Sequence, residues 1–198
     1  MRARDKFLRK VSLFLFCIFL SPSMSFAQED IAKKILNHNI SLKDSSANFI
    51  QTDGATIEEG VVYIGDERIK IEYVNPRKIT ITLSKKRGMY VNHELKETQF
   101  FYTKKNFINI IFKILTGEKY FEISDLEFYK NTITIKNQFE IDNKIYFIES
   151  VYENNPVKLR KIKVLENEFG FEVGIGEQKK QEVFGRNFFS LIDPYLKN

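Results

Sequence analysis

Two short segments of this chain alternate strictly between polar and apolar residues, and this two-residue period constrains the fold more than any other feature. The segments are residues 68–73 (RIKIEY) and 78–83 (KITITL). Successive side chains of a β-strand point to opposite faces, so the alternation predicts strands that are wetted on one side only. Strand-like runs begin at Ala47 and recur up to Gly176. The fold is therefore expected to be mainly β.

Turn residues separate these runs. Further strands are expected at residues 89–92, 95–103, 120–129, 132–138, 144–152, 159–165 and 169–176. Dipeptides such as Asp53-Gly54 and Asn75-Pro76 lie between strands and suit tight reversals. An antiparallel meander is the expected topology, and this many strands predicts strong curling or a barrel rather than a flat sheet.

Two segments have helical character. Residues 28–40 place isoleucine and leucine at helical spacing, with two acidic residues in the first turn. Residues 105–115 (KNFINIIFKIL) are apolar on nearly every side, unlike a surface helix with one buried stripe. Their β-branched residues also allow a strand, but the lack of alternation and the ending at Thr116-Gly117 favour a helix. This helix is expected to be buried or to cover an apolar surface.

Residues 1–27 have the pattern of a secretory signal peptide. A basic start is followed by the apolar run 11–20 and by small residues at positions −3 and −1 of a cleavage site after Ala27. The apolar run has half of the ~20 residues that a membrane-spanning helix needs, so cleavage is favoured over a retained anchor. Cys17 follows bulky rather than small residues, which argues against a lipid-modified cysteine. We expect export, cleavage after Ala27 and a single domain over 28–198.

The formal charge of +5 does not indicate a nucleic-acid-binding protein. Residues 1–27 hold five basic residues and one acidic residue, so +4 of the charge would leave with the signal peptide. The other 26 basic and 25 acidic residues nearly balance, without a basic stripe interleaved with aromatic residues. We expect no nucleic-acid partner. Removing 27 of 198 residues leaves 171 without cysteine, so stability is expected from packing and not from disulfides.

The expected mature chain has no recognisable catalytic motif. Its two histidines, His38 and His93, lie near no nucleophile motif and form no metal-ligand cluster, and we expect both to face solvent. The acidic pairs at 58–59 and 66–67 fall at expected turns, where carboxylates are ordinarily solvated. The sequence therefore predicts no metal, no cofactor and a binding protein rather than an enzyme.

Several short motifs follow one another in order along residues 28–198. They are Phe49-x-Gln51, Gly60, Lys70-Ile71-Glu72-Tyr73-x-x-Pro76, Gly88-Met89-Tyr90-Val91-Asn92-x-x-Leu95-x-Glu97, the apolar run up to Gly117, Pro156-x-x-Leu159 and Phe189-Ser190-Leu191-Ile192-Asp193-Pro194. In order and spacing this set resembles the LolA-like family of periplasmic carriers of outer-membrane lipoproteins. The chain departs from the family at Gly65-Asp66, where a basic residue and proline are frequent, and at Lys70, where arginine is usual.

The resemblance implies a mainly β (α+β) fold, an incomplete, strongly curled antiparallel β-barrel with helices covering an apolar concavity. It further implies a monomeric periplasmic protein that binds the acyl chains of lipoproteins. The implied partners are acylated lipoproteins, an inner-membrane lipoprotein release complex and an outer-membrane lipoprotein acceptor. A periplasmic lipid- or lipoprotein-sensing regulatory domain of the same fold remains the alternative. A secreted lipid hydrolase would need a nucleophile and a base, and a structural envelope component would self-associate.

The alternation and the resemblance together define a candidate site. The expected cavity lining comprises Ile69, Ile71, Tyr73, Ile79, Ile81, Leu83, Val91, Ile133 and Ile135, and the expected lid comprises Ile110, Ile111, Ile114 and Leu115. Ordinary core packing is the competing interpretation for each of these residues. Phe49 is expected in the core with Gln51 hydrogen-bonded inside it, whereas Arg68, Lys70 and Lys78 are expected on a solvated outer face.

Overall fold

The computed structural model describes residues 23–118, 125–181 and 183–196. The chain divides into two compact units, Met1–Lys34 and Ile35–Asn198. Helix α2 (Ser23–Ser41) begins in the first unit and ends in the second. It contains the predicted helix at 28–40 and starts five residues earlier. Most of the predicted signal peptide lies outside the described residues, and no described helix is long and apolar enough to cross a membrane.

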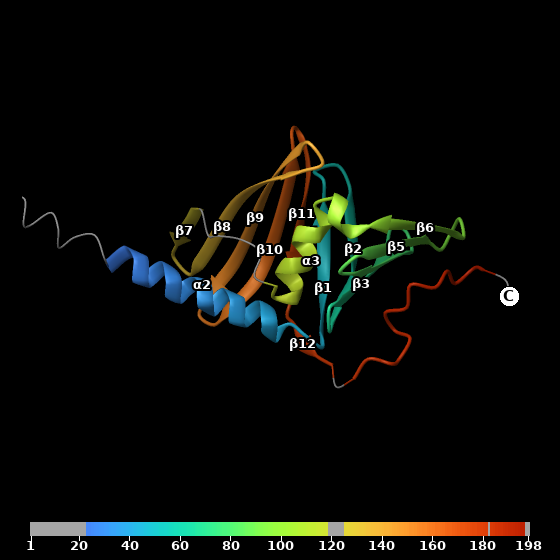
Figure 1. Cartoon of the computed structure of the whole chain (residues 1–198), viewed down its shortest axis with the longest axis horizontal. Helices are drawn as coiled ribbons and strands as arrows, with labels where there is room; N and C mark the ends of the chain where they lie inside the picture. Colours follow the sequence, from blue (N-terminus) through green and yellow to red (C-terminus); the bar gives the residue numbers. More distant parts are fainter. Residues whose placement is uncertain (1–22, 119–124, 182, 197–198) are drawn as a thin grey trace, which may run out of the picture. The chain divides into compact units, whose positions relative to one another are not determined.

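The second unit is built on one antiparallel sheet of twelve strands (Figure 1). The strands are β1 (Ser45–Thr52), β2 (Ile57–Gly65), β3 (Arg68–Asn75), β4 (Ile79–Ser84), β5 (Arg87–Asn92), β6 (Glu97–Tyr102), β7 (Asp125–Tyr129), β8 (Thr132–Ile141), β9 (Lys144–Asn154), β10 (Val157–Glu166), β11 (Phe169–Ile175) and β12 (Lys179–Lys180). The predicted strands match these bounds within a few residues, except that part of the segment 120–129 lies outside the described residues. The two-residue β12 was not predicted.

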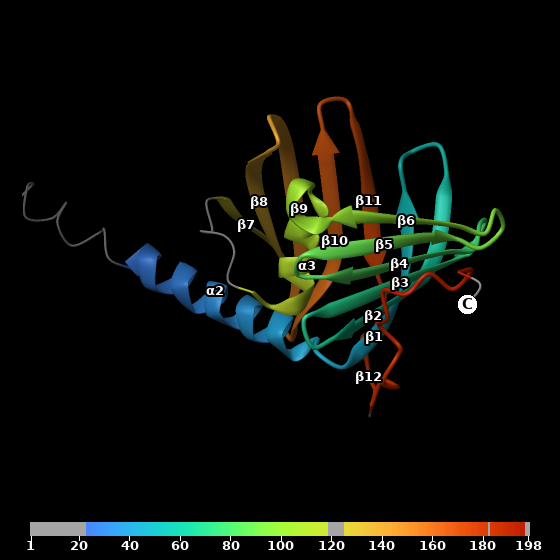
Figure 2. The same ribbon diagram turned by 45° about the vertical axis from the view of Figure 1, so that its right-hand side comes forward.

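The strand order shows two meanders joined side by side. The order is β6-β5-β4-β3-β2-β1-β11-β10-β9-β8-β7, and β12 pairs with β1. The meanders join where β1 pairs with β11, with Phe49 opposite Ile175. In Figure 2, strands β3–β6 run across the view while β8–β11 stand upright, so the sheet curls strongly along its length. Among the described strands β6 and β7 do not pair with each other, so the sheet is open, in agreement with the predicted curling.

A short helix lies against the inner, concave face of this sheet. The 3-10 turn η1 (Thr103–Lys105) follows β6 and leads to α3 (Ile108–Thr116), which confirms most of the predicted helix at 105–115 (Figure 2). The helix ends as predicted at Gly117, which adopts the left-handed conformation with φ 71°. The Glu118 N–H then donates to the Lys113 carbonyl at 3.1 Å, which completes a Schellman ending.

The outer face of the first meander, which comprises strands β1–β6, is covered and not solvated. Thr82, Met89 and Val91 are 1%, 4% and 1% exposed, although their register places them opposite to the inner-facing Ile81. The C-terminal segment, defined here as residues 183–196, covers this face. Asp193, for example, accepts a hydrogen bond of 2.7 Å from the hydroxyl of Thr98, which pairs with Val91.

This covering corrects two expectations. Val91 pairs with Thr80, which pairs with Glu72, so it lies on the outer face and not in the concavity. Lys70 is also not solvated, because its Nζ lies 4.4 Å from the centre of the Phe188 ring and 2.6 Å from a carboxylate oxygen of Glu72. Alternation identifies which residues share a face, but a strand buried on both faces does not reveal which face is inner.

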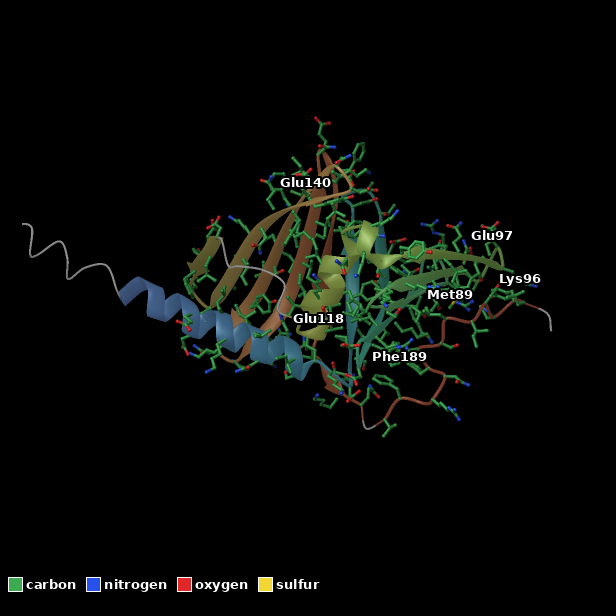
Figure 3. All side chains as sticks on the ribbon, viewed as in Figure 1. Met89, Lys96, Glu97, Glu118, Glu140 and Phe189 are labelled. Carbon is green, nitrogen blue, oxygen red and sulfur yellow. The ribbon has the colours of Figure 1, made fainter. Side chains whose placement is uncertain are left out.

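The C-terminal segment packs through aromatic rings. Phe188 lies 5.0 Å from Tyr63 and stacks on Phe184 at 4.9 Å between ring centres. Figure 3 labels Phe189 of this segment and Met89 of β5. A Cβ atom at Gly65 would lie 2.6 Å from the Phe189 ring, so this glycine lets the ring approach the end of β2.

Candidate ligand cavity

An apolar cavity of about 200 Å³ lies between α3 and the inner face of the sheet. It is lined by Phe49, Gln51, Val62, Ile71, Tyr73, Ile81, Phe107, Ile108, Ile111, Leu115, Ile162, Phe171, Val173 and Ile175. Twelve of these fourteen side chains are purely apolar, and the other two are Gln51 and Tyr73. The surroundings therefore suit a hydrocarbon ligand with little more than one polar group.

Strand register explains why these residues meet. Val62, Ile71 and Ile81 pair across β2, β3 and β4, so their side chains form one row on the inner face. The β1–β11 pairing then sets Gln51 opposite Val173 and joins the walls supplied by the two meanders. The cavity depends on this contact between strands that are distant in sequence.

Helix α3 presents different residues to the cavity and to the protein core. Ile110 and Ile114 are 4% and 0% exposed, so they pack into the core. Phe107, Ile108 and Ile111 line the cavity and are only partly buried. Apolar surface left in contact with water costs about 25 cal/mol per Å², so these side chains would be stabilised by an apolar ligand.

Aromatic rings shape two parts of the cavity wall. Phe107 lies 5.7 Å from Tyr146 and 5.5 Å from Phe171, between ring centres. The Phe49 ring meets Tyr73 edge to face at 5.1 Å. The Phe49 ring also lies 2.6 Å from where a Cβ atom of Gly60 would be, so only glycine at this position leaves room for it.

A polar corner interrupts the apolar wall near the end of β1. The Tyr73 hydroxyl donates to Gln51 Oε1 at 3.0 Å, and Gln51 Nε2 donates to Glu58 Oε2 at 3.1 Å. Arg77 approaches the other oxygen of Glu58 at 3.3 Å. Burial, together with the negative charge of Glu58, raises the pKa of Tyr73 to about 12, so the phenol stays protonated at neutral pH.

The predictions for β1 are confirmed, whereas the one for Glu58 is not. Phe49 is 5% exposed, and Gln51 is hydrogen-bonded on the same face. Glu58 was expected at a solvated turn, but it lies within β2 and its side chain is 18% exposed. The hydrogen bonds that its carboxylate accepts from Gln51 and Arg77 compensate for this partial burial.

The structure brings only part of the predicted site together. Ile71, Tyr73 and Ile81 of the predicted lining, and Ile111 and Leu115 of the predicted lid, line the cavity. Ile69, Ile79, Leu83, Ile133 and Ile135 are buried on the inner face without lining it, Val91 lies on the outer face, and Ile110 and Ile114 pack into the core. Lipid contact by any of these residues stays a prediction.

The lining from β10, β11 and the start of α3 was missed, as was Val62 of β2. Phe171, Val173 and Ile175 alternate in a segment that was recognised as a strand, so the signal for an apolar face was present. The sequence did not indicate that this face lies beside β1, because β11 pairs with β1 across more than 100 residues of sequence. Ile162 and Phe107 were missed for the same reason.

Neither histidine faces solvent freely, contrary to expectation. His38 Nε2 accepts a hydrogen bond of 3.0 Å from the Leu159 N–H. Burial, followed by the positive charges of Arg160 and Lys158, lowers the pKa of His38 to about 4. His93 lies between the Thr80 hydroxyl at 2.8 Å and the Tyr195 hydroxyl at 2.9 Å. Within the described ranges, no three His, Cys, Asp or Glu side chains group in a way that could hold a metal ion.

Comparison of the sequence with protein-family models and with curated proteins finds no match. Among solved structures, an uncharacterized conserved protein from Thermus thermophilus has a TM-score of 0.46 and 9% identity, covering 77% of this chain and 89% of that chain. MucB, in complex with MucA(peri), has a TM-score of 0.43 and 7% identity, and the match covers 82% of this chain and 58% of MucB. PNGF-II has a TM-score of 0.40 and 10% identity, covering 74% of this chain and 29% of that chain. Likenesses this distant carry no information about function.

Proposed function

We propose that this protein is a periplasmic carrier that binds the acyl chains of lipoproteins released from the inner membrane and delivers them to the outer membrane. The observation that carries the proposal is the apolar cavity, in whose lining Ile108 and Ile111 of α3 and three side chains of β11 are only partly buried. The ordered motifs that resemble the LolA-like family support the same function. In this proposal the curled open sheet is an incomplete barrel and α3 forms part of its lid.

The physical need for such a cavity follows from the cost of exposing hydrocarbon. Each methylene of an acyl chain in water costs ~0.8 kcal/mol, so a lipoprotein with long chains cannot cross an aqueous compartment without shielding. The cavity of about 200 Å³ is smaller than the ~300–1,000 Å³ of typical small-molecule sites. A carrier of this form must therefore enlarge the cavity on loading, and displacement of α3 from the sheet is the simplest route.

The remaining features of the proposal concern location and partners. The protein would be exported, cleaved after Ala27 and monomeric. It would receive its cargo from an inner-membrane lipoprotein release complex and pass it to an outer-membrane lipoprotein acceptor. It would act by binding alone, without catalysis or a cofactor.

Native mass spectrometry tests the proposal directly. The full chain is expressed with its own leader, purified without detergent and mixed with one lipoprotein in acylated and unacylated forms. We expect a soluble one-to-one complex with the acylated form only, and an intact mass that corresponds to cleavage after Ala27. Binding to neither form would refute a carrier, and equal binding to both would indicate recognition of the polypeptide instead of the acyl chains.

A further inference from the structure

The polar corner gives the cavity a chemical preference that an apolar surface alone would lack. Gln51 and Tyr73 are the two lining residues with hydrogen-bonding side chains, and they contact each other. Both are partly exposed, as is Glu58 behind them. An acyl chain lying along the apolar wall would therefore bring its polar end to this corner if the chain enters tail first.

The corner retains hydrogen-bonding capacity for such a polar group. The amide nitrogen of Gln51 has two N–H groups, and its contact with Glu58 uses one of them. The Tyr73 hydroxyl donates its proton to Gln51, which leaves its oxygen as an acceptor. A carbonyl oxygen could accept from Gln51, and a neighbouring hydroxyl or amide N–H could donate to Tyr73.

The same corner is unfavourable for a negative charge. A ligand oxygen bound to Gln51 would lie about 5 Å from Glu58 Oε2, because two hydrogen bonds of about 3 Å share the amide nitrogen. The positive charge of Arg77 compensates poorly for the negative charge of Glu58 at the ligand, since Arg77 contacts the opposite oxygen of Glu58 and its side chain is 59% exposed. Like charges at this separation destabilise each other in a partly buried site.

We propose that Gln51 and Tyr73 recognise the neutral ester or amide end of an acyl compound, and that Glu58 discriminates against free fatty-acid anions. This inference rests on the proposed function, because it names the class of acyl ligand that the cavity accepts. A carrier with this preference would ignore free fatty acids and bind chains that are still attached to their cargo. The raised pKa of Tyr73 agrees with this assignment, since burial and the Glu58 charge keep its hydroxyl neutral.

The test measures displacement of the apolar dye Nile red from the full-chain protein at about pH 8. The two probes are 1-monolauroylglycerol, a neutral ester, and laurate, an anion with the same chain. Glu58→Gln should strengthen laurate binding about tenfold relative to monoglyceride binding, because it removes the charge and keeps an amide partner for Gln51. Tyr73→Phe should weaken monoglyceride binding about fivefold relative to laurate binding.

Glu59→Gln is the matched control. Glu59 adjoins Glu58 in β2, but it pairs with Ile50 on the outer face and is exposed. The Glu59→Gln substitution therefore removes one negative charge at a position away from the polar corner. Equal effects of Glu58→Gln and Glu59→Gln on laurate, or no effect of Tyr73→Phe on the monoglyceride, would overturn the inference and leave the carrier function standing. Failure of both probes to displace the dye from the wild type would refute the two proposals together.

Discussion

The imidazole of His38, on α2, accepts a hydrogen bond from the backbone N–H of Leu159, on β10. The bond lies next to the register shift between Leu159 and Lys161 in the β9–β10 pairing. One residue along, the side chain of Asn39 donates to the hydroxyl of the fully buried Tyr152 at 3.2 Å. These two contacts anchor the last turns of α2 to the sheet.

The His38 contact makes folding stability depend on pH. Only a neutral imidazole can accept this bond, and the pKa of His38 is lowered from 6.5 to about 4. Between these two values the unfolded chain binds a proton that the folded chain does not, so stability falls as pH falls through this window. Because His38 is only partly buried, we expect a loss on the order of 1 kcal/mol.

Urea unfolding of the wild type and His38→Gln, at about pH 7.5 and pH 4.5, measures this loss. Glutamine can accept the same bond through Oε1 but does not titrate, so the variant should lose less stability on acidification. Equal losses for the two proteins would show that the acid sensitivity has another origin.

Ile111→Asp separates the role of the cavity from that of the core. Ile111 lines the cavity and is partly exposed, so a carboxylate there can still reach water; the substitution should cost about 2 kcal/mol and weaken Nile red binding at least tenfold. Ile114→Asp is the comparison, because Ile114 is 0% exposed and a buried charge should cost more than about 4 kcal/mol. Unfolding of both variants would identify Ile111 as a core residue.

Gly60→Ala should destabilise the protein by about 2 kcal/mol. The added Cβ would meet the Phe49 ring at 2.6 Å and also the backbone carbonyl of Glu72, which cannot move aside without disturbing β3. Gly185→Ala is the control, because a Cβ at that position has nothing within 4 Å. Thermal unfolding of the two variants compares the effects, and a Gly60→Ala protein as stable as Gly185→Ala would contradict this packing.

Phe188→Ala tests the covering of the outer face by the C-terminal segment. Its ring lies 4.4 Å from Lys70 Nζ and 5.0 Å from Tyr63, so its removal should cost about 1–3 kcal/mol. Val183→Ala is a suitable control, because Val183 is 85% exposed. If the two variants have the same urea midpoint, the segment contributes nothing to stability through this ring.

Local patterns in the sequence determined the elements of the second unit. Alternation at residues 68–73 and 78–83 predicted β3 and β4, and the apolar run before Gly117 predicted α3 and its ending. These predictions succeed because strand pleating, helical spacing and turn conformation depend on residues close together in the chain. Phe49 and Gln51 were correctly placed on one face for the same reason.

Tertiary contacts decided which faces are buried and where the cavity lies. Lys70 is covered by Phe188 of the C-terminal segment, Val91 is 1% exposed on the same outer face, and His38 contacts β10, although nothing near these residues in sequence indicates this. The cavity forms where β11 meets β1 and where α3 lies against both meanders. Periodicity records which side chains share a face, but burial of that face depends on segments distant in the chain, and only the folded structure brings them together.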